Sequence, residues 1–242
     1  MPHDGLASWR LRTYGRRHGH RLRETRSQLI EWLLPRLRIW AAGEDQSGPR
    51  IADPHTLFDG PIRDIWLEIG FGGGEHLAGV AAANRDIGLI GCEPFINGVA
   101  SLLRHVSDAE LTNVRVHDGD ARTVIDALPD ASIGRVYLLF PDPWPKNRHH
   151  KRRIVSLPFL DTLARIMNDG AEFFFASDHH EYAAWTLERL IAHPTFIWPA
   201  YSRRDWLRPA GWIETRYEAK ALAAGGSCLY LSAIRRPRDN DQ

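Results

Sequence analysis

The chain has 242 residues, of which 43% are hydrophobic and 25% charged, and this composition excludes disordered, fibrous and membrane-embedded proteins. Its 31 Lys and Arg balance 30 Asp and Glu, so the protein is not globally basic, although charge can still be segregated along the chain. Two cysteines, and no apolar run near the roughly 18 residues of a membrane span, exclude a disulfide framework, a cysteine-rich zinc module and a transmembrane helix, and point to a cytoplasmic protein of one domain.

The beginning of the chain is strongly basic. Residues 10–26 hold seven arginines and one acid, and we expect residues 1–25 to form a flexible basic arm without a secretory leader. Residues 26–61 follow as a helix and a linker. Leucine and isoleucine at spacings of three and four predict a helix over 24–39 that Pro35 breaks, and glycine and proline fill the linker.

From residue 62 onward, short apolar runs alternate with amphipathic or alanine-rich segments. Such alternation predicts a doubly wound, mostly parallel α/β sheet with helices on both faces, and we place this domain at 62–236 with a tail at 237–242. The expected strands span 62–69, 87–92, 114–117, 136–140, 171–176 and 227–234. The expected helices span 75–84, 96–106, 121–128, 157–167, closed by Asn168-Asp169-Gly170, and 181–191.

A glycine-rich loop, Glu68–Gly74 (EIGFGGG), follows the first expected strand. Ligands of doubly wound sheets bind at the carboxyl ends of the strands, and glycine lets the backbone approach them closely. The dinucleotide fingerprint needs a third glycine where Glu75 stands, which disfavours a nicotinamide-dependent oxidoreductase. The spacing of Gly70, Gly72 and Gly74 instead resembles the S-adenosylmethionine loop of Rossmann-like methyltransferases.

Three acids near the ends of the first three strands are candidate cofactor ligands. Glu68 could hold the ammonium group of S-adenosylmethionine, directly or through water. Glu93 follows the second strand, about 20 residues after the glycines, where a carboxylate can accept hydrogen bonds from both ribose hydroxyls. Asp120 follows the third strand and could accept from the adenine amino group, cap the next helix, or do both.

The segment after the fourth strand, Phe140–Lys146 (FPDPWPK), is the most informative in the chain. Three prolines in five residues predict a rigid, extended loop, which would hold Asp142 beside the glycine loop. Trp144 separates the prolines, so the loop differs from the Asp/Asn-Pro-Pro-Tyr/Trp motif of amino-group methyltransferases. Residues 146–153 carry five cations and two histidines, and together with the basic arm they indicate polyanion binding.

The segment Phe140–Arg153 (FPDPWPKNRHHKRR) resembles the diagnostic segment of the bacterial tRNA (guanine-N7)-methyltransferases of the TrmB type. The glycine loop, the basic arm and Thr215–Glu218 (TRYE) are similar to other motifs of that family. The resemblance implies a Rossmann-like class I fold with a seven-stranded sheet. It also implies methyl transfer from S-adenosyl-L-methionine to N7 of guanine 46 in the variable loop of tRNA, by a monomer or homodimer without an obligatory protein partner or a metal.

The resemblance also implies roles for individual residues, with Asp142 catalytic. The residues expected at the cofactor are Glu68, Gly70, Gly72, Gly74, Glu93, Asp120 and Asp142. Those expected at the substrate are Lys146, Asp178, Thr215, Arg216, Tyr217 and Glu218, and those expected on RNA are Arg148, His149, His150, Lys151, Arg152 and Arg153. Asn147, Arg216 and Tyr217 depart from the residues common in the family, which concerns RNA contacts more than the reaction.

The chemistry needs alignment more than proton transfer, because guanine N7 carries a lone pair and no proton. A carboxylate that accepts from guanine N1–H and its amino group would offset the developing positive charge; Asp142 is the first candidate and Glu218 the second. Trp144 could stack on an extruded base or pack the loop onto the core. Asp178 and Glu181 suit a helix-capping box better than a metal site. The alternative function is a non-catalytic RNA-binding protein on a methyltransferase fold.

Overall fold

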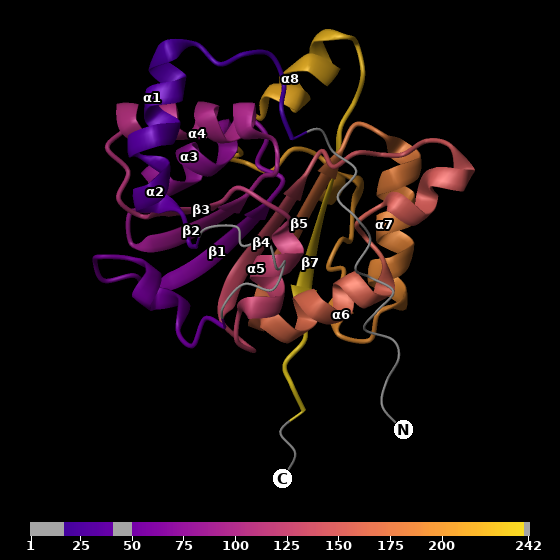
Figure 1. Ribbon diagram of the computed structural model, residues 1–242. Helices are drawn as coiled ribbons and strands as arrows, with labels where there is room; N and C mark the ends of the chain where they lie inside the picture. Colours follow the sequence, from indigo (N-terminus) through magenta and orange to yellow (C-terminus); the bar gives the residue numbers. More distant parts are fainter. Residues whose placement is uncertain (1–16, 41–49, 240–242) are drawn as a thin grey trace.

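The computed structural model describes residues 17–40 and 50–239. Most of the predicted basic arm (1–16), the middle of the predicted linker (41–49) and the end of the predicted tail (240–242) lie outside the described residues. Figure 1 shows the described chain as a central sheet with helices on both sides.

The sheet has seven strands in the order β3-β2-β1-β4-β5-β7-β6 (Figure 1). All neighbouring pairs among β1 to β5 are parallel, and only β7 runs antiparallel to its neighbours β5 and β6. This order confirms the predicted doubly wound, mostly parallel sheet. The strands are β1 (Asp64–Ile69), β2 (Ile87–Cys92), β3 (Val114–His117), β4 (Ile133–Leu139), β5 (Met167–Ser177), β6 (Phe196–Ile197) and β7 (Leu229–Arg235).

Eight helices and three short 3-10 turns complete the described part of the chain. Helices α1 to α4 and α8 lie on one face of the sheet, and α5 to α7 lie on the other (Figure 1). The helices are α1 (Glu24–Trp32), α2 (Leu34–Leu37), α3 (Glu75–Ala83), α4 (Ile96–Asp108), α5 (Ala121–Ala127), α6 (Leu157–Ile166), α7 (His180–Ala192) and α8 (Arg216–Ala223). The turns are η2 (Pro54–Leu57), η3 (Asn147–Arg152) and η4 (Arg203–Trp206).

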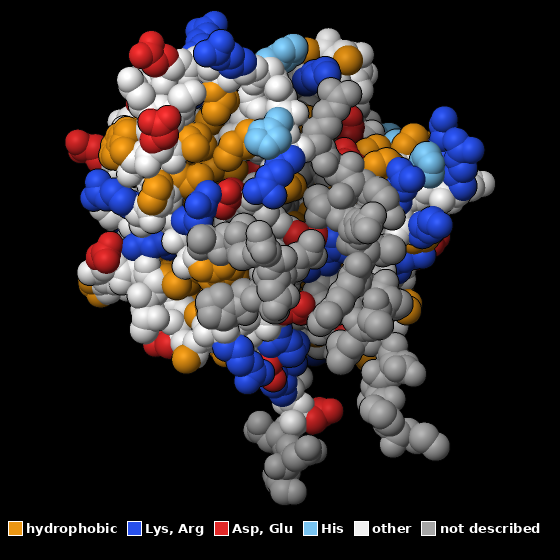
Figure 2. All heavy atoms as spheres, viewed as in Figure 1, with side chains coloured by type: hydrophobic (Ala, Val, Ile, Leu, Met, Phe, Trp, Pro, Cys, Tyr) orange, Lys and Arg blue, Asp and Glu red, His pale blue; other side chains and the backbone are white. Residues whose placement is uncertain are grey.

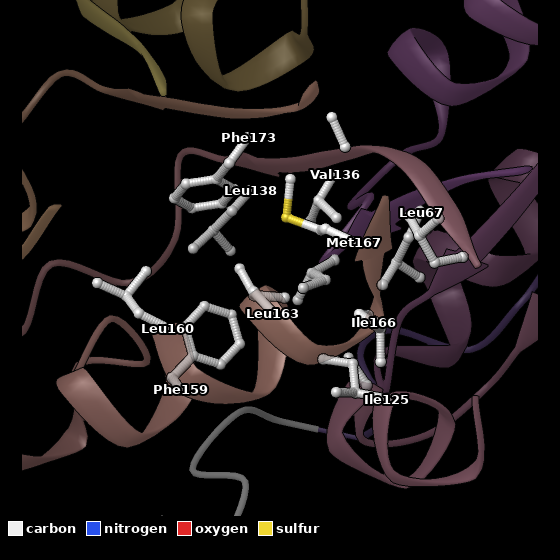
Figure 3. Packing of buried hydrophobic residues seen from close by; sticks show 14 of the residues in the cluster. Leu67, Ile125, Val136, Leu138, Phe159, Leu160, Leu163, Ile166, Met167 and Phe173 are labelled. Carbon is white, nitrogen blue, oxygen red and sulfur yellow. The ribbon is translucent and has the colours of Figure 1, made fainter. Parts of the chain in front are cut away.

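The central strands are apolar along their whole length because both faces of the sheet are covered. All six residues of β2 are buried, for example. The larger core fills the space between the sheet and α5 to α7, and each fully buried large side chain there contributes about 1.5–3 kcal/mol relative to an exposed one. Figure 3 labels its central members, which are Leu67, Ile125, Val136, Leu138, Phe159, Leu160, Leu163, Ile166, Met167 and Phe173.

The N-terminal helix breaks where proline predicts it. Helix α1 ends at Trp32, and α2 begins at Leu34 with Pro35 in its first turn, where a missing N–H costs nothing. The preceding segment, 17–20, lies against the start of α4. Ile96 N donates to Arg17 O over 3.0 Å, and the Asn97 amide accepts from Gly19 N over 2.9 Å and donates to His20 O over 2.7 Å.

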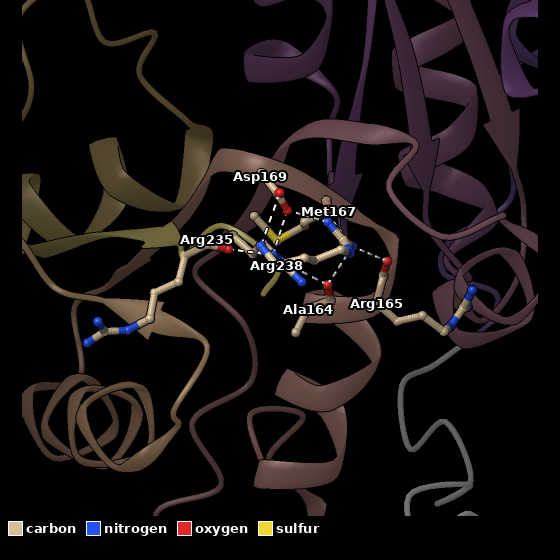
Figure 4. Close-up of polar contacts among 7 residues, drawn as sticks. Ala164, Arg165, Met167, Asp169, Arg235 and Arg238 are labelled. Carbon is tan, nitrogen blue, oxygen red and sulfur yellow. Dashed lines mark hydrogen bonds and ion pairs between the residues drawn. The ribbon is translucent and has the colours of Figure 1, made fainter. Parts of the chain in front are cut away.

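The prediction that Asn168–Gly170 closes the helix before β5 is wrong. Helix α6 ends at Ile166 and the chain enters β5 directly. The carbonyl groups at this helix end instead bind a distant side chain, since Arg238 donates to the carbonyl oxygens of Ala164, Arg165 and Met167. Asp169 pairs with both Arg235 and Arg238 (Figure 4). Arg238, in the predicted tail, is therefore bound to the end of α6.

Candidate active site

A cavity of about 690 Å³ opens at the carboxyl ends of β1 to β4. Strands β1 to β3 follow one another toward one edge of the sheet, and β4 and β5 toward the other edge, so the strand order switches between β1 and β4. Doubly wound sheets bind their ligands at such a switch point. Four loops and the segment that leads into α6 form the wall. They contribute Gly70 and Gly72 after β1, residues 92–95 at the end of β2, 119–122 after β3, 140–142 and 144 after β4, and 150–156, 158 and 159 before and in α6.

The glycine loop depends on the special conformation of its residues. Gly70, Gly72 and Gly74 have φ of +72°, +56° and +82°, in the left-handed region that favours glycine. Tyr217, the second residue of α8, lies over the loop, and its Cε2 is 2.9 Å from the position of a Cβ on Gly72. A Cβ on Gly98 of α4 would stand 2.2 Å from the carbonyl oxygen of Gly72. Two helices therefore confine this loop closely.

Glu93 braces the same loop while lining the cavity. Its Oε2 accepts a hydrogen bond from Gly72 N over 2.8 Å, and its Oε1 accepts from Phe95 N over 2.9 Å. Burial raises the pKa of Glu93 above its ordinary value, against the effect of these two bonds. Each carboxylate oxygen can still accept a second hydrogen bond. The predicted ribose contact is thus open to Glu93.

Asp120 is the N-cap of α5, as one of the two sequence alternatives requires. Its Oδ1 accepts from Arg122 N over 3.0 Å, and its carboxylate also pairs with the guanidinium of Arg122. Both side chains line the cavity. The contact of Asp120 with adenine stays a prediction, and Arg122 is a cavity residue that the sequence analysis did not select.

Glu68 lies outside the cavity wall, unlike the expectation for a direct cofactor ligand. It is buried, with Oε2 2.8 Å from Nδ1 of His76 in α3. The imidazole of His76 packs against the rings of Tyr137 and Trp212, at 4.8 and 5.0 Å between centroids. A role for Glu68 toward the cofactor stays a prediction, and in this arrangement it would run through water.

The proline loop after β4 has a strained backbone. Phe140 and Trp144 have φ of +50° and +44°, a conformation that costs bulky L-residues free energy and persists only where the surroundings enforce it. Asp142 lies between them, is exposed, and lines the cavity. The ring of Trp144 also lines the cavity, and the guanidinium carbon of Arg152 stands 4.8 Å from its centre.

The basic run after the loop forms η3 and divides into exposed and buried cations. Lys146, Arg148 and Lys151 are exposed. Lys, Arg and His side chains gather at the upper right of Figure 2, where Figure 1 draws this segment between β4 and α6. The side chain of Arg153 is 0% exposed, which disfavours the RNA contact predicted for it, and that contact stays a prediction. His150 is half-buried, with Nε2 3.4 Å from Oε1 of Glu181.

The start of α7 differs from the predicted capping box of Asp178 and Glu181. The N-cap is His179, whose ring nitrogen accepts from Tyr182 N over 3.2 Å. Glu181 turns to Arg153 instead, because a buried guanidinium attracts the carboxylate more strongly than a backbone N–H does. Asp178 is exposed after β5, and a contact with substrate stays a prediction.

The C-terminal motif Thr215–Glu218 also contains both buried and exposed residues. Thr215 and Glu218 form a capping box at the start of α8, and Glu218 is 0% exposed. Its carboxylate accepts from Trp212 Nε1 over 2.9 Å and from the Tyr230 hydroxyl. These internal hydrogen bonds disfavour Glu218 as the residue that holds guanine, and that contact stays a prediction. The S/T-x-x-E spacing is itself a capping signature, which the sequence could have shown. Arg216 and Tyr217 are exposed.

Metal-binding and membrane features are not found in the part of the chain that the structure describes. Among residues 17–40 and 50–239, no group of three or more His, Cys, Asp or Glu side chains is placed to hold a metal ion. Within the same ranges, no helix combines the length and the apolar character that a membrane crossing requires.

Comparison with known proteins places this geometry in a family. The sequence profile described as "Putative methyltransferase" matches residues 63–231. A protein of Rhodospirillum rubrum named tRNA (guanine-N(7)-)-methyltransferase is 49% identical over 231 residues, which cover 95% of this chain and 90% of the relative. A protein of the same name from Paramagnetospirillum magneticum is 48% identical over 93% of each chain. The chain belongs to the tRNA (guanine-N(7)-)-methyltransferase family.

Membership of this methyltransferase family confirms the resemblance, the enzyme class and S-adenosyl-L-methionine as cofactor. Among solved structures, the 16S rRNA methyltransferase KamB superposes with a TM-score of 0.53 at 16% identity, over 73% of this chain and 89% of that one. This likeness confirms the methyltransferase fold alone.

The cavity wall fits S-adenosylmethionine. The left-handed glycines let the backbone approach the aminoacyl part. Glu93 and Asp120 supply acceptors for hydroxyl and amino donors. Phe95 and Ala121 add apolar surface beside them for an adenine ring. The volume of about 690 Å³ lies in the range of nucleoside-sized ligands.

Proposed function

We propose that this family member methylates N7 of a guanine in tRNA, at position 46 of the variable loop, with S-adenosyl-L-methionine as donor. The observation that carries the proposal is the position of Asp142: an exposed carboxylate on a strained loop, at the wall of the cofactor cavity. The family membership and the names of the relatives support the choice of base and atom.

The residues divide the work between orientation and charge. When bound, the cofactor supplies an electrophilic methyl group on its sulfonium. Asp142 accepts hydrogen bonds from guanine N1–H and the exocyclic amine, so the base is oriented and its developing positive charge is offset. Trp144 offers a ring face beside this carboxylate for an extruded base. No residue has to remove a proton from N7.

The exposed cations next to the loop hold the RNA backbone. Lys146, Arg148 and Lys151 lie on or beside η3, within nine residues of Asp142 in sequence, and Lys151 also lines the cavity. Phosphate contacts of this kind supply affinity and register without reading sequence. Arg153, which is buried, does not take part in this contact.

The test uses an unmodified tRNA transcript, labelled cofactor and mapping of the methylated nucleotide. The wild-type protein should label one guanine, and a transcript with 7-deazaguanine at that position should not be labelled. Asp142→Ala should lower turnover about 100-fold with cofactor affinity near wild type by calorimetry. Asp108→Ala, which removes an exposed acid at the far end of α4, is the matched control and should leave turnover unchanged. Binding of tRNA without label transfer to any transcript would favour the non-catalytic alternative.

A further inference from the structure

The buried guanidinium of Arg153 connects the proline loop to helix α7. Its Nε donates to the carbonyl oxygen of Pro143 over 2.8 Å, and its Nη2 donates to Oε1 of Glu181 over 3.0 Å. The guanidinium carbon also stands 5.0 Å from the ring centres of Tyr182 and Trp185. These contacts join the loop to a helix whose Tyr182 is completely buried in the core.

The hydrogen bond to Pro143 lies next to the strained residue Trp144 of the loop. The Pro143 carbonyl belongs to the peptide between that proline and Trp144, directly after Asp142. Trp144 has φ of +44°, so this peptide is held in an orientation that the chain alone disfavours. A hydrogen bond from a buried, charged donor can offset such strain, since hydrogen bonds that involve a charged group are stronger than neutral ones. Pro143 and Pro145 stiffen the loop without selecting this orientation.

Two further residues of the basic run also contact the loop. Arg152 places its guanidinium over the Trp144 ring at 4.8 Å, and the imidazole of His149 meets the same ring edge-on at 5.9 Å. The run therefore has an outer side, with Arg148 and Lys151 exposed, and an inner side that faces the loop. Arg153 is the buried end of that inner side.

We propose that Arg153 is a positioning residue for methyl transfer, which holds Asp142 and Trp144 in their working orientation and does not bind RNA. This inference rests on the proposed function. It separates two properties of one basic run: the exposed cations determine RNA affinity, whereas the Arg153–Glu181 pair determines the rate at which bound substrate reacts. A displacement of the reacting groups by about 1 Å can cost 100-fold in rate.

The experiment compares single-turnover rates at saturating cofactor and tRNA with tRNA affinity measured at several salt concentrations. Arg153→Lys shortens the fork and cannot hold both acceptors, and should lower the rate about 100-fold with an unchanged salt slope. Glu181→Gln keeps the shape of an exposed partner and should lower the rate less, with the same unchanged slope. Lys151→Ala, from the outer side, should weaken RNA binding and reduce the slope by about one. Asp108→Ala, at the far end of α4, is the control for the rate and should leave both the rate and the slope at wild-type values.

The outcomes are distinguishable. A wild-type rate in Arg153→Lys overturns the inference, and a salt slope reduced by about one in that variant shows a phosphate contact instead. If Arg153→Lys does not fold, as circular dichroism would show, Glu181→Gln decides: a wild-type rate overturns the inference, and a lower rate at unchanged affinity supports it. If the wild-type protein methylates no guanine N7, the proposed function itself is refuted. That result differs from a failure of the Arg153 inference, in which the wild type is active and Arg153→Lys is equally active.

Discussion

Replacing Glu218 separates a structural role from contact with substrate. This carboxylate is 0% exposed at the first turn of α8. It accepts from the Trp212 indole and the Tyr230 hydroxyl, and more weakly from Thr215 N at 3.4 Å. Arg208 lies 3.3 Å from it but is 41% exposed, so water screens that ion pair and it adds little. Glu218→Ala would therefore leave two good donors, the buried Tyr230 hydroxyl and the partly buried Trp212 indole, and one weak donor without this acceptor.

The expected loss follows from those donors. An unsatisfied buried donor costs about 1–3 kcal/mol, and loss of one member of a buried charged network costs about 3–5 kcal/mol. For two good donors the two estimates agree near about 3–5 kcal/mol for Glu218→Ala. In a chain of this size each kcal/mol shifts Tm by about 2–4 °C, so Tm should fall by about 6–20 °C. Glu218→Gln keeps one acceptor oxygen and should lose about half as much stability.

The assay is calorimetric unfolding of the protein without cofactor, followed by methyl transfer well below the Tm of each variant. Glu218→Gln should unfold at lower temperature than wild type and retain most of its activity at 20 °C or below. Glu214→Gln is the matched control because this neighbouring acid is 44% exposed, and its Tm should stay close to wild type. If Glu218→Gln keeps the wild-type Tm and loses methyl transfer, then Glu218 contacts substrate and the structural reasoning is refuted.

Three further predictions concern the cavity wall, a buried histidine and the arm. Gly98→Ala would drive a methyl into the carbonyl of Gly72 and should raise the dissociation constant for S-adenosylmethionine more than tenfold by calorimetry, whereas Gly60→Ala, with nothing within 4 Å, should not. Burial lowers the pKa of His117, which favours its neutral form in the fold. Unfolding free energy should therefore fall as pH drops below about 6.5, where the unfolded chain gains the proton. Urea denaturation at pH 7.5 and 5.5 should show a larger loss for wild type than for His117→Gln, and equal losses would contradict the assignment. Asn97→Ala removes both side-chain bonds to the 17–20 segment and should speed proteolytic cleavage there, while an unchanged cleavage rate would show that the Ile96 bond alone suffices.

Local features of this protein follow from the sequence by itself. The bounds of β2 and β3 agree with the predicted strands residue for residue, because apolar runs between turn residues determine buried strands locally. Pro35 breaks the first helix, and Asp120 caps α5, through groups at most a few residues apart. The left-handed conformation of the glycines in the cofactor loop is also a local feature, since glycine, which has no side chain, adopts that conformation easily.

Only the tertiary structure determines which charged residues of the motifs are buried and which are exposed. Arg153 and Arg148 look alike in the basic run, yet one is buried against Glu181, 28 residues away, and the other is exposed. Glu218 pairs with Tyr230 of β7, and the C-terminal end of α6 is capped by Arg238, more than 70 residues away. A charged side chain must be either solvated by water or paired with another group. The sequence does not show which of these applies, because the surrounding elements determine whether the side chain is buried. Once it is buried, water is excluded and its partner is a residue that can be distant in sequence.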